Sequence, residues 1–460
     1  MALQNTRYGA ERIADMLKSS KSIFFCGIGG IHMSSLAHIA SIMGYAVSGS
    51  DRTKTPLTER LEKEGIKISY CHAAENVANA DMLVYTVAIS PDNPEYTEAK
   101  KRGIPAVSRA DFLGYIMSSY KNRIGISGAH GKSTCVSMAA HIFDKAGMDA
   151  TVVSGAEYAG MGGAYRIGGK ENFVFESCEY MDNFLSFYPS IAVILNIEFD
   201  HGDYFADLEA VKSSFRSYAQ LSLSAGGRVL ANGDDAVTKS ALDGLSVTTF
   251  GKGEGCDYRA VDITVEGGRP SFTIVCPDGE KYSVYLSAAG EHNVYNALAS
   301  FASLDMCGGD RAIAAKAFSD FLGAKRRMEF KKQVCGADVY EDYAHHPTEI
   351  SATIRAARMQ SGGRIICVFQ PHTYSRTAEL FDGFVSSLSE ADKVYLLPIY
   401  SARETDTLGM SSELLAEKIE GAYAARGFEE LADILKAELK AGDTLLVTGA
   451  GDVIKLTALL

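Results

Sequence analysis

Short apolar stretches rich in Ile, Val and Phe alternate along the chain with longer segments whose apolar residues recur at helical spacing. Because short apolar runs suit buried parallel strands and helical spacing suits covering helices, the alternation predicts repeated strand–helix units. The pattern falls into three blocks. The expected strands are residues 22–26, 45–48 and 81–86 in the first block, 123–127, 173–175 and 191–195 in the second, and 339–340, 364–369, 393–397 and 444–447 in the third.

One region departs from this pattern near the end of the middle block. Between residues 258 and 287 apolar and polar side chains alternate one by one, which indicates strands with one buried face. Pro277, Asp278 and Gly279 separate SFTIVC from KYSVYLS. We therefore expect an antiparallel hairpin there.

The overall composition is that of a folded protein, with 47% apolar and 22% charged residues. The net charge of −12, with Lys and Arg scattered, argues against nucleic acid or an anionic membrane surface as the main partner. No apolar run approaches the roughly 18 residues of a membrane span, and the start of the chain does not resemble a signal peptide. We expect a cytoplasmic protein without membrane insertion.

Nine cysteines occur without a C-x-x-C pair and lie mostly inside apolar segments. This spacing suits neither a disulfide framework nor a zinc site, so we expect buried free thiols. Cys135 and Cys178 lie beside the motifs below, but no basic neighbour in the sequence argues for a lowered pKa.

The clearest motif is GISGAHGKST at residues 125–134, between an apolar strand and a helical stretch. In a P-loop, backbone N–H groups turn toward phosphate, Lys132 reaches the β and γ phosphates, and Ser133 binds magnesium. Ile126 stands where the first glycine of the usual spacing would be, so a glycine-rich turn without a ligand is the alternative. The other predicted ATP contacts of this loop are Gly128, Ala129, His130, Gly131 and Thr134.

A second glycine cluster joins the first strand to its helix, which is expected to start near Met33. His32 occupies the place of the third glycine of G-x-G-x-x-G, so a nicotinamide cofactor is not required, and a ligand-free turn is again the alternative. The better functional interpretation is a nucleotide-sugar diphosphate at the helix N-terminus. The predicted contacts are Gly27, Gly29, Gly30, His32, Met33, Ser34 and Asp51.

Acidic and histidine side chains follow the next strands. Glu176 and Glu179 come after one strand and His201 after another. Because the carboxyl ends of parallel strands share an edge, a carboxylate and an imidazole can meet beside the phosphates and bind a second magnesium. Each residue taken singly also fits a solvated loop.

Further polar residues occur at helix starts and strand ends. Asn293 and Asn296 lie on one face of a helix, although capping alone also explains Asn293. His345 and His346 lack a spaced third ligand, which argues against zinc. The remaining candidates are His292, Arg327, Asp342 and Arg376.

Seven of these strings resemble motifs of the Mur ligase family, in the same order and over essentially the whole chain: GIGGIHMS, GAHGKST, ESCEY, NIEFDH, GEHNVYNAL, DYAHHPTE and FQPHTYSRT. The resemblance implies an α/β fold of three domains. These are an N-terminal Rossmann-like domain for UDP-N-acetylmuramate (1–116), a central P-loop ATPase-like domain with the hairpin region (117–323), and a C-terminal Rossmann-like domain that closes and helps bind the amino acid (324–460).

The same resemblance implies ATP and Mg²⁺ as cofactors, and amide formation between L-alanine and the lactyl carboxylate of UDP-N-acetylmuramate through an acyl phosphate. Lys132 then neutralises the transferred phosphoryl group, while Ser133, Glu176 and His201 bind magnesium; Glu179 is an alternative to Glu176. The resemblance places His292, Asn293, Asn296, Arg327 and Asp342 at ATP, and His345 and Arg376 near the acyl phosphate and amino acid. We expect a monomer or a weak homodimer.

Three alternatives remain. A recycling ligase would attach a preformed peptide to the same UDP-sugar, although the GIGG loop favours alanine. A non-catalytic regulator would bind ATP and UDP-sugar without turnover. A dehydrogenase would use the first glycine cluster and Asp51 for a dinucleotide, and the second phosphate loop argues against it.

Overall fold

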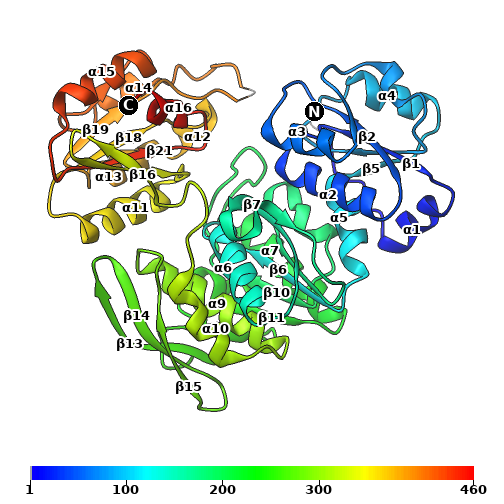
Figure 1. Cartoon of the computed structure of the whole chain (residues 1–460), viewed down its shortest axis with the longest axis horizontal. Helices are drawn as coiled ribbons and strands as arrows, with labels where there is room; N and C mark the ends of the chain where they lie inside the picture. Colours follow the sequence, from blue (N-terminus) through cyan, green and yellow to red (C-terminus); the bar gives the residue numbers. More distant parts are fainter. Residues whose placement is uncertain (1–2, 403) are drawn as a thin grey trace. The chain divides into compact units, whose positions relative to one another are not determined.

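The computed structural model describes residues 3–402 and 404–460, and it contains three β-sheets with helices packed against them (Figure 1). The α/β fold predicted from the three blocks is confirmed. The chain forms two compact units, each described by itself below. The first unit comprises Met1–Glu198, Glu209–Phe250 and Ala299–Ala314, and the second comprises Phe199–Leu208, Gly251–Leu298 and Ala315–Leu460.

The N-terminal sheet is parallel, with the strand order β3-β2-β1-β4-β5. Side chains of β1 alternate between its faces: Phe24 and Cys26 pack with Tyr96 of α4, while Phe25 meets Phe112 of α5 edge-to-face. Strands β2 and β3 are added on one side of β1, and β4 and β5 are added on its other side. Parallel α/β sheets bind ligands at the point where the strand order switches in this way. The elements are α1 (Ala10–Lys18), β1 (Ser22–Cys26), α2 (Ile31–Ile42), β2 (Ala46–Ser50), α3 (Pro56–Lys63), β3 (Lys67–Ser69), η1 (Ala74–Val77), β4 (Met82–Tyr85), α4 (Pro94–Lys101), β5 (Ala106–Ser108) and α5 (Arg109–Ser118).

The rest of the first unit is built on a sheet that includes the run β12-β11-β10-β6-β9-β7-β8. β6 lies inside this run, parallel to β9 and β10, and its last four residues are buried. A buried strand of this kind gives the loop that follows it a rigid base. The elements are β6 (Asn122–Ser127), α6 (Lys132–Lys145), β7 (Thr151–Tyr158), η2 (Ala159–Met161), β8 (Gly163–Arg166), β9 (Asn172–Glu176), η3 (Tyr180–Ser186), β10 (Ile191–Ile194), α7 (Leu208–Ser224), β11 (Arg228–Asn232), α8 (Ala236–Ala241) and β12 (Thr248–Gly251).

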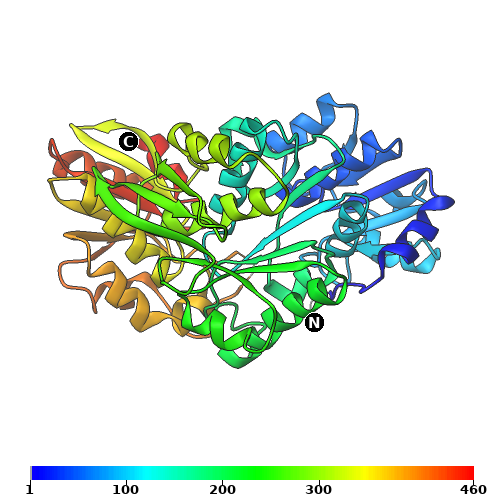
Figure 2. The same ribbon diagram turned by 90° about the horizontal axis from the view of Figure 1, so that it is seen from below.

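The second unit contains the expected antiparallel hairpin, seen as a twisted ribbon in Figures 1 and 2. β14 pairs with β15 from Ser271↔Tyr285 to Val275↔Lys281, and Gly279 adopts φ +87° in the turn. The hairpin prediction is therefore confirmed, and β13 adds a further antiparallel strand. The elements of this region are β13 (Tyr258–Glu266), β14 (Arg269–Val275), β15 (Lys281–Tyr285), α9 (His292–Met306), α10 (Arg311–Ala317) and η4 (Phe318–Asp320), and the parts of α9 and α10 within residues 299–314 belong to the first unit.

The C-terminal sheet has the order β16-β17-β21-β18-β19-β20, and β16 is its antiparallel edge strand. Alternate residues of β18 face opposite sides: Ile366 and Val368 join a core with α15 and α16, and Cys367 and Phe369 join one with α11 and α13. The sheet is thus covered on both faces, as Rossmann-like sheets are. The elements are β16 (Glu329–Val334), β17 (Ala337–Asp342), α11 (Pro347–Gln360), β18 (Ile365–Phe369), α12 (Tyr374–Glu379), α13 (Phe381–Leu388), β19 (Lys393–Leu396), α14 (Ser412–Ala416), β20 (Tyr423–Ala424), α15 (Phe428–Glu438), β21 (Thr444–Thr448) and α16 (Ile454–Leu459).

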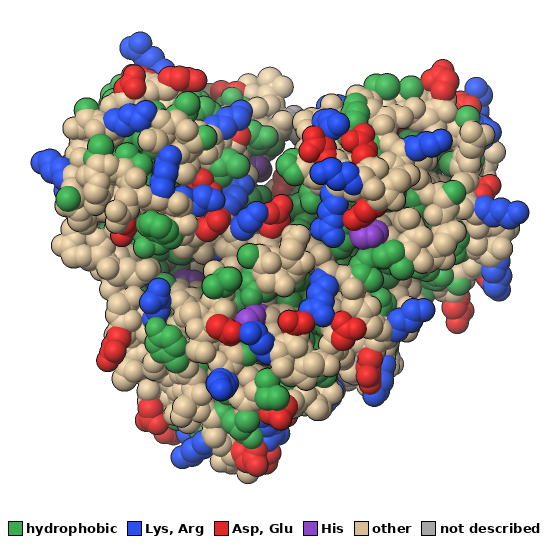
Figure 3. Space-filling model, viewed as in Figure 1, with side chains coloured by type: hydrophobic (Ala, Val, Ile, Leu, Met, Phe, Trp, Pro, Cys, Tyr) green, Lys and Arg blue, Asp and Glu red, His purple; other side chains and the backbone are tan. Residues whose placement is uncertain are grey.

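The surface and the cysteines complete the comparison with the sequence. Acidic and basic side chains lie intermixed on the face shown in Figure 3. Among the described residues, no helix combines the length and the apolar character needed to cross a membrane. All nine cysteines are free, but the expectation that they are buried is only partly correct, because Cys71 and Cys335 are exposed. Both lie in loops, outside the apolar strands that bury Cys26 and Cys367.

Candidate functional site

The P-loop sequence forms a tight turn between β6 and α6. Gly128 adopts φ +143°, and Gly131, the N-cap of α6, adopts φ +83°. A side chain at Gly128 would place its Cβ 3.0 Å from the Cβ of Leu195 and 3.2 Å from the amide nitrogen of Asn196. Both the backbone conformation and the space therefore require glycine. Gly131 caps α6 without a side-chain hydrogen bond, and the N-terminus of a helix favours an anion such as phosphate.

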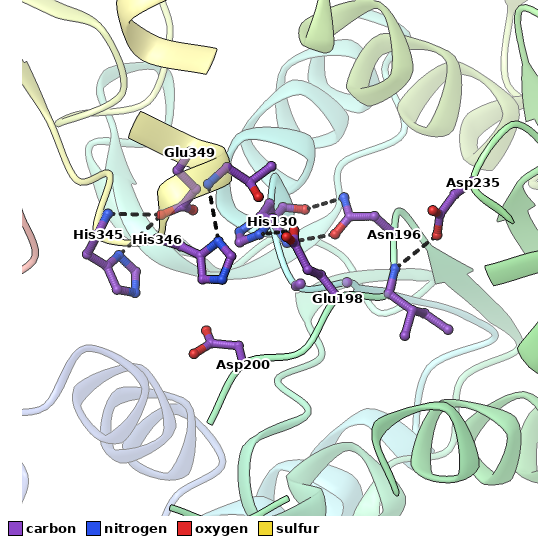
Figure 4. A network of polar contacts seen from close by, with 12 residues as sticks. His130, Asn196, Glu198, Asp200, Asp235, His345, His346 and Glu349 are labelled. Carbon is purple, nitrogen blue, oxygen red and sulfur yellow. Dashed lines mark hydrogen bonds and ion pairs between the residues drawn. The ribbon is translucent and has the colours of Figure 1, made fainter. Parts of the chain in front are cut away.

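Asn196, two residues after the end of β10, holds this turn in shape (Figure 4). Its Oδ1 accepts from the His130 amide at 2.8 Å, and its Nδ2 donates to the His130 carbonyl at 3.1 Å. Its own carbonyl accepts from the Ala129 amide at 3.2 Å. The His130 imidazole Nε2 lies 2.8 Å from Glu198 Oε2. The loop is thus preorganised by side chains of a neighbouring strand end.

Lys132 lies at the first position of α6 and is paired with Glu179. Its Nζ lies 3.0 Å from each oxygen of the Glu179 carboxylate and 3.1 Å from the Ala129 carbonyl. Burial would lower the pKa of Lys132, but the carboxylates of Glu179 and Glu176 raise it above its usual value. The lysine is therefore a positive charge held at the phosphate loop.

Ser133 and Glu176 form a second contact at the same helix start. Ser133 Oγ donates to Glu176 Oε2 at 2.8 Å, and the Gly155 amide donates to the same oxygen at 2.9 Å. A Cβ on Gly155 would lie 2.6 Å from that oxygen, so the glycine allows the close approach. Hydroxyl and carboxylate oxygens are the ligands that Mg²⁺ prefers, and the pair fits such an ion. Glu176 thus lies with Ser133, and Glu179 with Lys132.

The first glycine cluster is also a turn between a strand and a helix. The amides of Gly27 and Ile28 both donate to the Ser50 carbonyl at 2.9 Å, and Gly27 adopts φ +84°. The Gly29 amide donates to Asp51 Oδ2 at 2.9 Å, and a Cβ on Gly29 would lie 2.7 Å from that oxygen. Asp51 therefore shapes the loop itself. Gly30 is the N-cap of α2, which begins at Ile31, slightly earlier than expected.

Three predicted contacts of this loop lie in the first turn of α2. Met33 is buried, and the Ser34 hydroxyl donates to the Ile31 carbonyl at 2.9 Å, so both side chains serve the helix and its packing. His32 is different: its Nε2 is buried and has no hydrogen-bond partner among the described residues. Burial, followed by the charge of Arg109, lowers the pKa of His32 to about 4, so the imidazole is neutral.

The buried carboxylate of Glu95 forms hydrogen bonds with residues next to this loop. Glu95 Oε2 accepts from Ser50 Oγ at 2.6 Å and lies 2.9 Å from His72 Nδ1. Its Oε1 accepts from Asn76 Nδ2 at 2.7 Å, and the Cys26 thiol lies 3.0 Å from Oε2. Cys26 and Ser50 end β1 and β2, so this network joins the two strand ends next to the glycine turn.

In the second unit, Arg376 of α12 pairs with Asp200 at 2.7 Å. Burial would raise the pKa of Asp200, but His201 and Arg376 together lower it well below its usual value. His201 follows directly and adopts φ +59°. His201 and Glu176 belong to different units, so their joint binding of magnesium stays a prediction.

The end of β17 brings together several predicted residues of the second unit. Asp342 accepts from the Met328 amide at 2.7 Å and from the Ala344 amide at 2.8 Å, and burial raises its pKa to about 6 although Arg327 opposes the shift. Arg327 Nη1 lies 3.5 Å from Glu349 Oε1. Glu349 Oε2 also accepts from the His345 amide at 3.1 Å (Figure 4).

The two candidate asparagines lie within the first turns of α9. Asn296 Nδ2 donates to Asn293 Oδ1 at 2.9 Å, and Asn293 Nδ2 donates to the Ala289 carbonyl at 2.6 Å. Asn293 is thus inside the helix rather than its cap. Burial and then Arg327 lower the pKa of His292 to about 4. His346 caps α11, because its Nδ1 accepts from the Thr348 amide at 3.3 Å.

The sequence alone did not single out Asn196, Glu349 or Arg109 as individual residues. Asn196 is the first residue of the motif NIEFDH, and its position after a buried strand was the available signal. Glu349 looked like an ordinary residue of a helix first turn, where acidic side chains are common. Arg109 follows a short strand without any motif around it.

A phosphate loop with a paired lysine, and a hydroxyl–carboxylate pair beside it, define an α/β enzyme that uses a nucleoside triphosphate. Family models narrow this class. Residues 22–121 match the model described as Mur ligase family, catalytic domain, residues 126–304 the Mur ligase middle domain, and residues 326–451 the Mur ligase, glutamate ligase domain. The chain belongs to the Mur ligase family, whose members are ATP-dependent ligases.

Similar proteins agree with this family. The UDP-N-acetylmuramate--L-alanine ligase of Caldanaerobacter subterraneus subsp. tengcongensis is 45% identical over 444 residues, covering 95% of this chain and 96% of the relative. The solved UDP-N-acetylmuramate-alanine ligase of Thermotoga maritima is 26% identical with a TM-score of 0.80, covering 95% of this chain and 97% of that one. A murein peptide ligase from Psychrobacter arcticus is 24% identical with a TM-score of 0.71, covering 95% and 98%, and shares the fold.

Proposed function

We propose that this protein joins L-alanine to the lactyl carboxylate of UDP-N-acetylmuramate, with ATP converted to ADP and phosphate, in the synthesis of peptidoglycan precursors. The observation that carries the proposal is the contact of Ser133 with Glu176 at 2.8 Å next to the Lys132 charge, because it joins a phosphate loop to a carboxylate suited to a cation. The 45% identity to a ligase of this name supports the choice of substrates.

In this reaction an oxygen of the lactyl carboxylate attacks the γ phosphorus of ATP, and ADP leaves. The amine of alanine then attacks the carbonyl carbon of the acyl phosphate, loses a proton, and phosphate leaves. The loop amides of residues 128–131 bind the phosphates, and Lys132 offsets the charge that spreads over the transferred group. Ser133 and Glu176 would hold a magnesium ion, with His201 as the further expected ligand, and the ion would supply charge neutralisation for the phosphate oxygens.

The remaining predicted residues bind the three substrates. His292, Asn293, Asn296, Arg327 and Asp342 bind ATP, and His345 and Arg376 contact the acyl phosphate and the amino acid. Gly27, Gly29 and Gly30 present the N-terminus of α2 to the diphosphate of the UDP-sugar. Asp51 acts by shaping that loop.

The wider expectations belong to the same proposal. The domain limits are 1–116, 117–323 and 324–460, the protein acts in the cytoplasm, and it is a monomer or a weak homodimer. A recycling ligase that attaches a peptide is the alternative. The relatives named for alanine, which reach 45% identity, favour the single amino acid.

Phosphate release from ATP and magnesium tests this proposal, measured with UDP-N-acetylmuramate in the presence and absence of L-alanine, together with the product mass. We expect release only with all substrates, and a mass gain of one alanyl residue. Turnover that requires a tripeptide would identify the recycling ligase. Tight ATP binding without turnover for any amine would identify a regulator.

A further inference from the structure

Arg109 is a charged side chain to which the predicted function gives no role. It is the first residue of α5, directly after the N-cap Ser108. Burial lowers the pKa of its guanidinium, yet the side chain forms no hydrogen bond or ion pair with any residue that the structure describes. Arg109 is half-buried, and a partly desolvated cation without an ion-pair partner suits a group that meets an anionic ligand.

His32 is the second polar group of this kind in the first unit. Its Nε2 is buried without a hydrogen-bond partner among the described residues, and the charges of Arg109 and Glu176 act on its imidazole. The imidazole is neutral, so it offers one N–H donor or one lone pair. His32 lies in the first turn of α2, where the helix dipole also favours an anion.

The packing of the unit directs both residues toward Glu176. Helix α2 packs against α5 and against β7, whose Gly155 donates its amide to Glu176. Helix α5 packs against η3, which begins directly after Glu179; a Cβ on Gly114 of α5 would lie 2.2 Å from the Ser186 carbonyl oxygen. The Glu176 carboxylate acts electrostatically on both side chains. Ser133 and Gly155 both donate to Oε2 of that carboxylate, and no hydrogen bond joins Arg109 to Glu176 in the described part of the chain, so the guanidinium can meet another anion.

We propose that Arg109 and His32 form an anion-binding pair that receives an anionic oxygen of the nucleotide-sugar substrate at the end of β9, next to Glu176. This inference rests on the proposed function, which supplies a substrate with two candidate anions, its diphosphate and its lactyl carboxylate. Both are oxygen anions that a guanidinium binds through charge-assisted hydrogen bonds. The pair adds recognition beyond the glycine loop, whose amides carry no net charge.

The test compares binding of UDP-N-acetylmuramate with binding of UDP-N-acetylglucosamine, which has the diphosphate but no lactyl carboxylate. The variants are Arg109→Gln, Arg109→Lys and His32→Gly, and the matched control is Arg12→Gln, an exposed arginine of the same domain that stacks on Tyr8. We expect Arg109→Gln to weaken binding about 10- to 100-fold, as loss of a charged hydrogen bond does, and His32→Gly to weaken it less. ATP affinity and the control stay within about twofold.

The outcomes distinguish the diphosphate from the lactyl carboxylate. They also distinguish failure of this inference from failure of the proposed function. An equal loss for both sugars assigns the pair to the diphosphate, and a loss confined to UDP-N-acetylmuramate assigns it to the carboxylate. Unchanged affinity for both sugars in Arg109→Gln or, if that variant does not fold, in Arg109→Lys and His32→Gly overturns the inference. If the wild-type protein binds neither sugar, the proposed function fails instead, and binding of inorganic pyrophosphate by the same variants then decides the inference.

Discussion

The two glycine turns of the first unit have the same local plan and different chemistry. Each follows a buried parallel strand and opens a helix, and each contains a glycine with positive φ, Gly27 in one and Gly128 in the other. The turn after β6 leads into a lysine and a hydroxyl that meet two carboxylates from the end of β9 and the loop after it, whereas the turn after β1 places no cation in the loop. A phosphoryl group that is transferred requires positive charge that offsets the negative charge it develops. A diphosphate that is only bound requires hydrogen-bond donors.

The largest expected effect concerns the turn after β6, where the phosphoryl group is transferred. Replacing Lys132 by Ala removes the charge at the phosphate loop and should lower kcat at least about 1,000-fold, as loss of a preorganised charge at a transferring phosphoryl group does. Steady-state phosphate release measures it. UDP-sugar binding should stay within about threefold. Lys170→Ala, an exposed lysine of the same unit, is the control, and a K132A enzyme that keeps a tenth of its activity would contradict the assignment.

The second prediction concerns the hydrogen-bond network of Glu95, which lies next to the glycine turn after β1 (residues 27–30), called the anchoring turn below. Replacing Glu95 by Ala leaves the donors of Ser50, His72 and Asn76 without their buried acceptor and should reduce the free energy of unfolding by roughly 2–4 kcal/mol. Denaturant titration measures this loss. Glu95→Gln keeps an acceptor oxygen and should lose less than half as much. Equal losses in the two variants would mean that the charge, rather than the network, stabilises the strand ends.

The fold followed from the alternation of apolar runs and helical segments, because strands such as β1, β6 and β18 are buried on both faces and read as continuous apolar runs. The hairpin followed from the alternation and from the turn at Gly279. The predicted partners of phosphate lay within local strings, which is why Lys132 and Ser133 were identifiable. Asn196 acts through contacts with a loop far away in the chain, and the surroundings of Arg109 likewise come from segments that are distant in sequence, so no local pattern reports either residue.

The third prediction separates the two turns by ligand. Gly29→Ala places a Cβ against Asp51 and should weaken UDP-sugar binding about 10- to 100-fold while ATP affinity stays unchanged. Gly128→Ala strains a residue at φ +143° and should do the reverse. Binding of each ligand to each variant, measured by calorimetry, gives a two-by-two comparison. Loss of both affinities in one variant would show that the turns are not independent.

The smallest effect concerns the pH dependence of the free energy of unfolding that is caused by His32, the neutral imidazole beside the anchoring turn. Burial, and then Arg109, lower the pKa of His32 from the usual 6.5 to about 4 in the folded protein. The unfolded chain therefore binds a proton first as the pH falls, so His32 costs stability progressively between pH 6.5 and 4, by at most about 1.4 kcal/mol per pH unit, and costs nothing above pH 7. Unfolding free energies of wild type and His32→Gln should differ by a constant above pH 7, and the variant should gain relative to wild type below pH 6. Because the charge of Arg109 contributes to lowering the pKa of His32, Arg109→Gln should raise that folded-state pKa, make the divergence smaller and end it at a higher pH. A difference between wild type and His32→Gln that is flat from pH 8 to pH 4 would mean that the imidazole is solvated, and the anchoring turn would then lack the buried donor that distinguishes it.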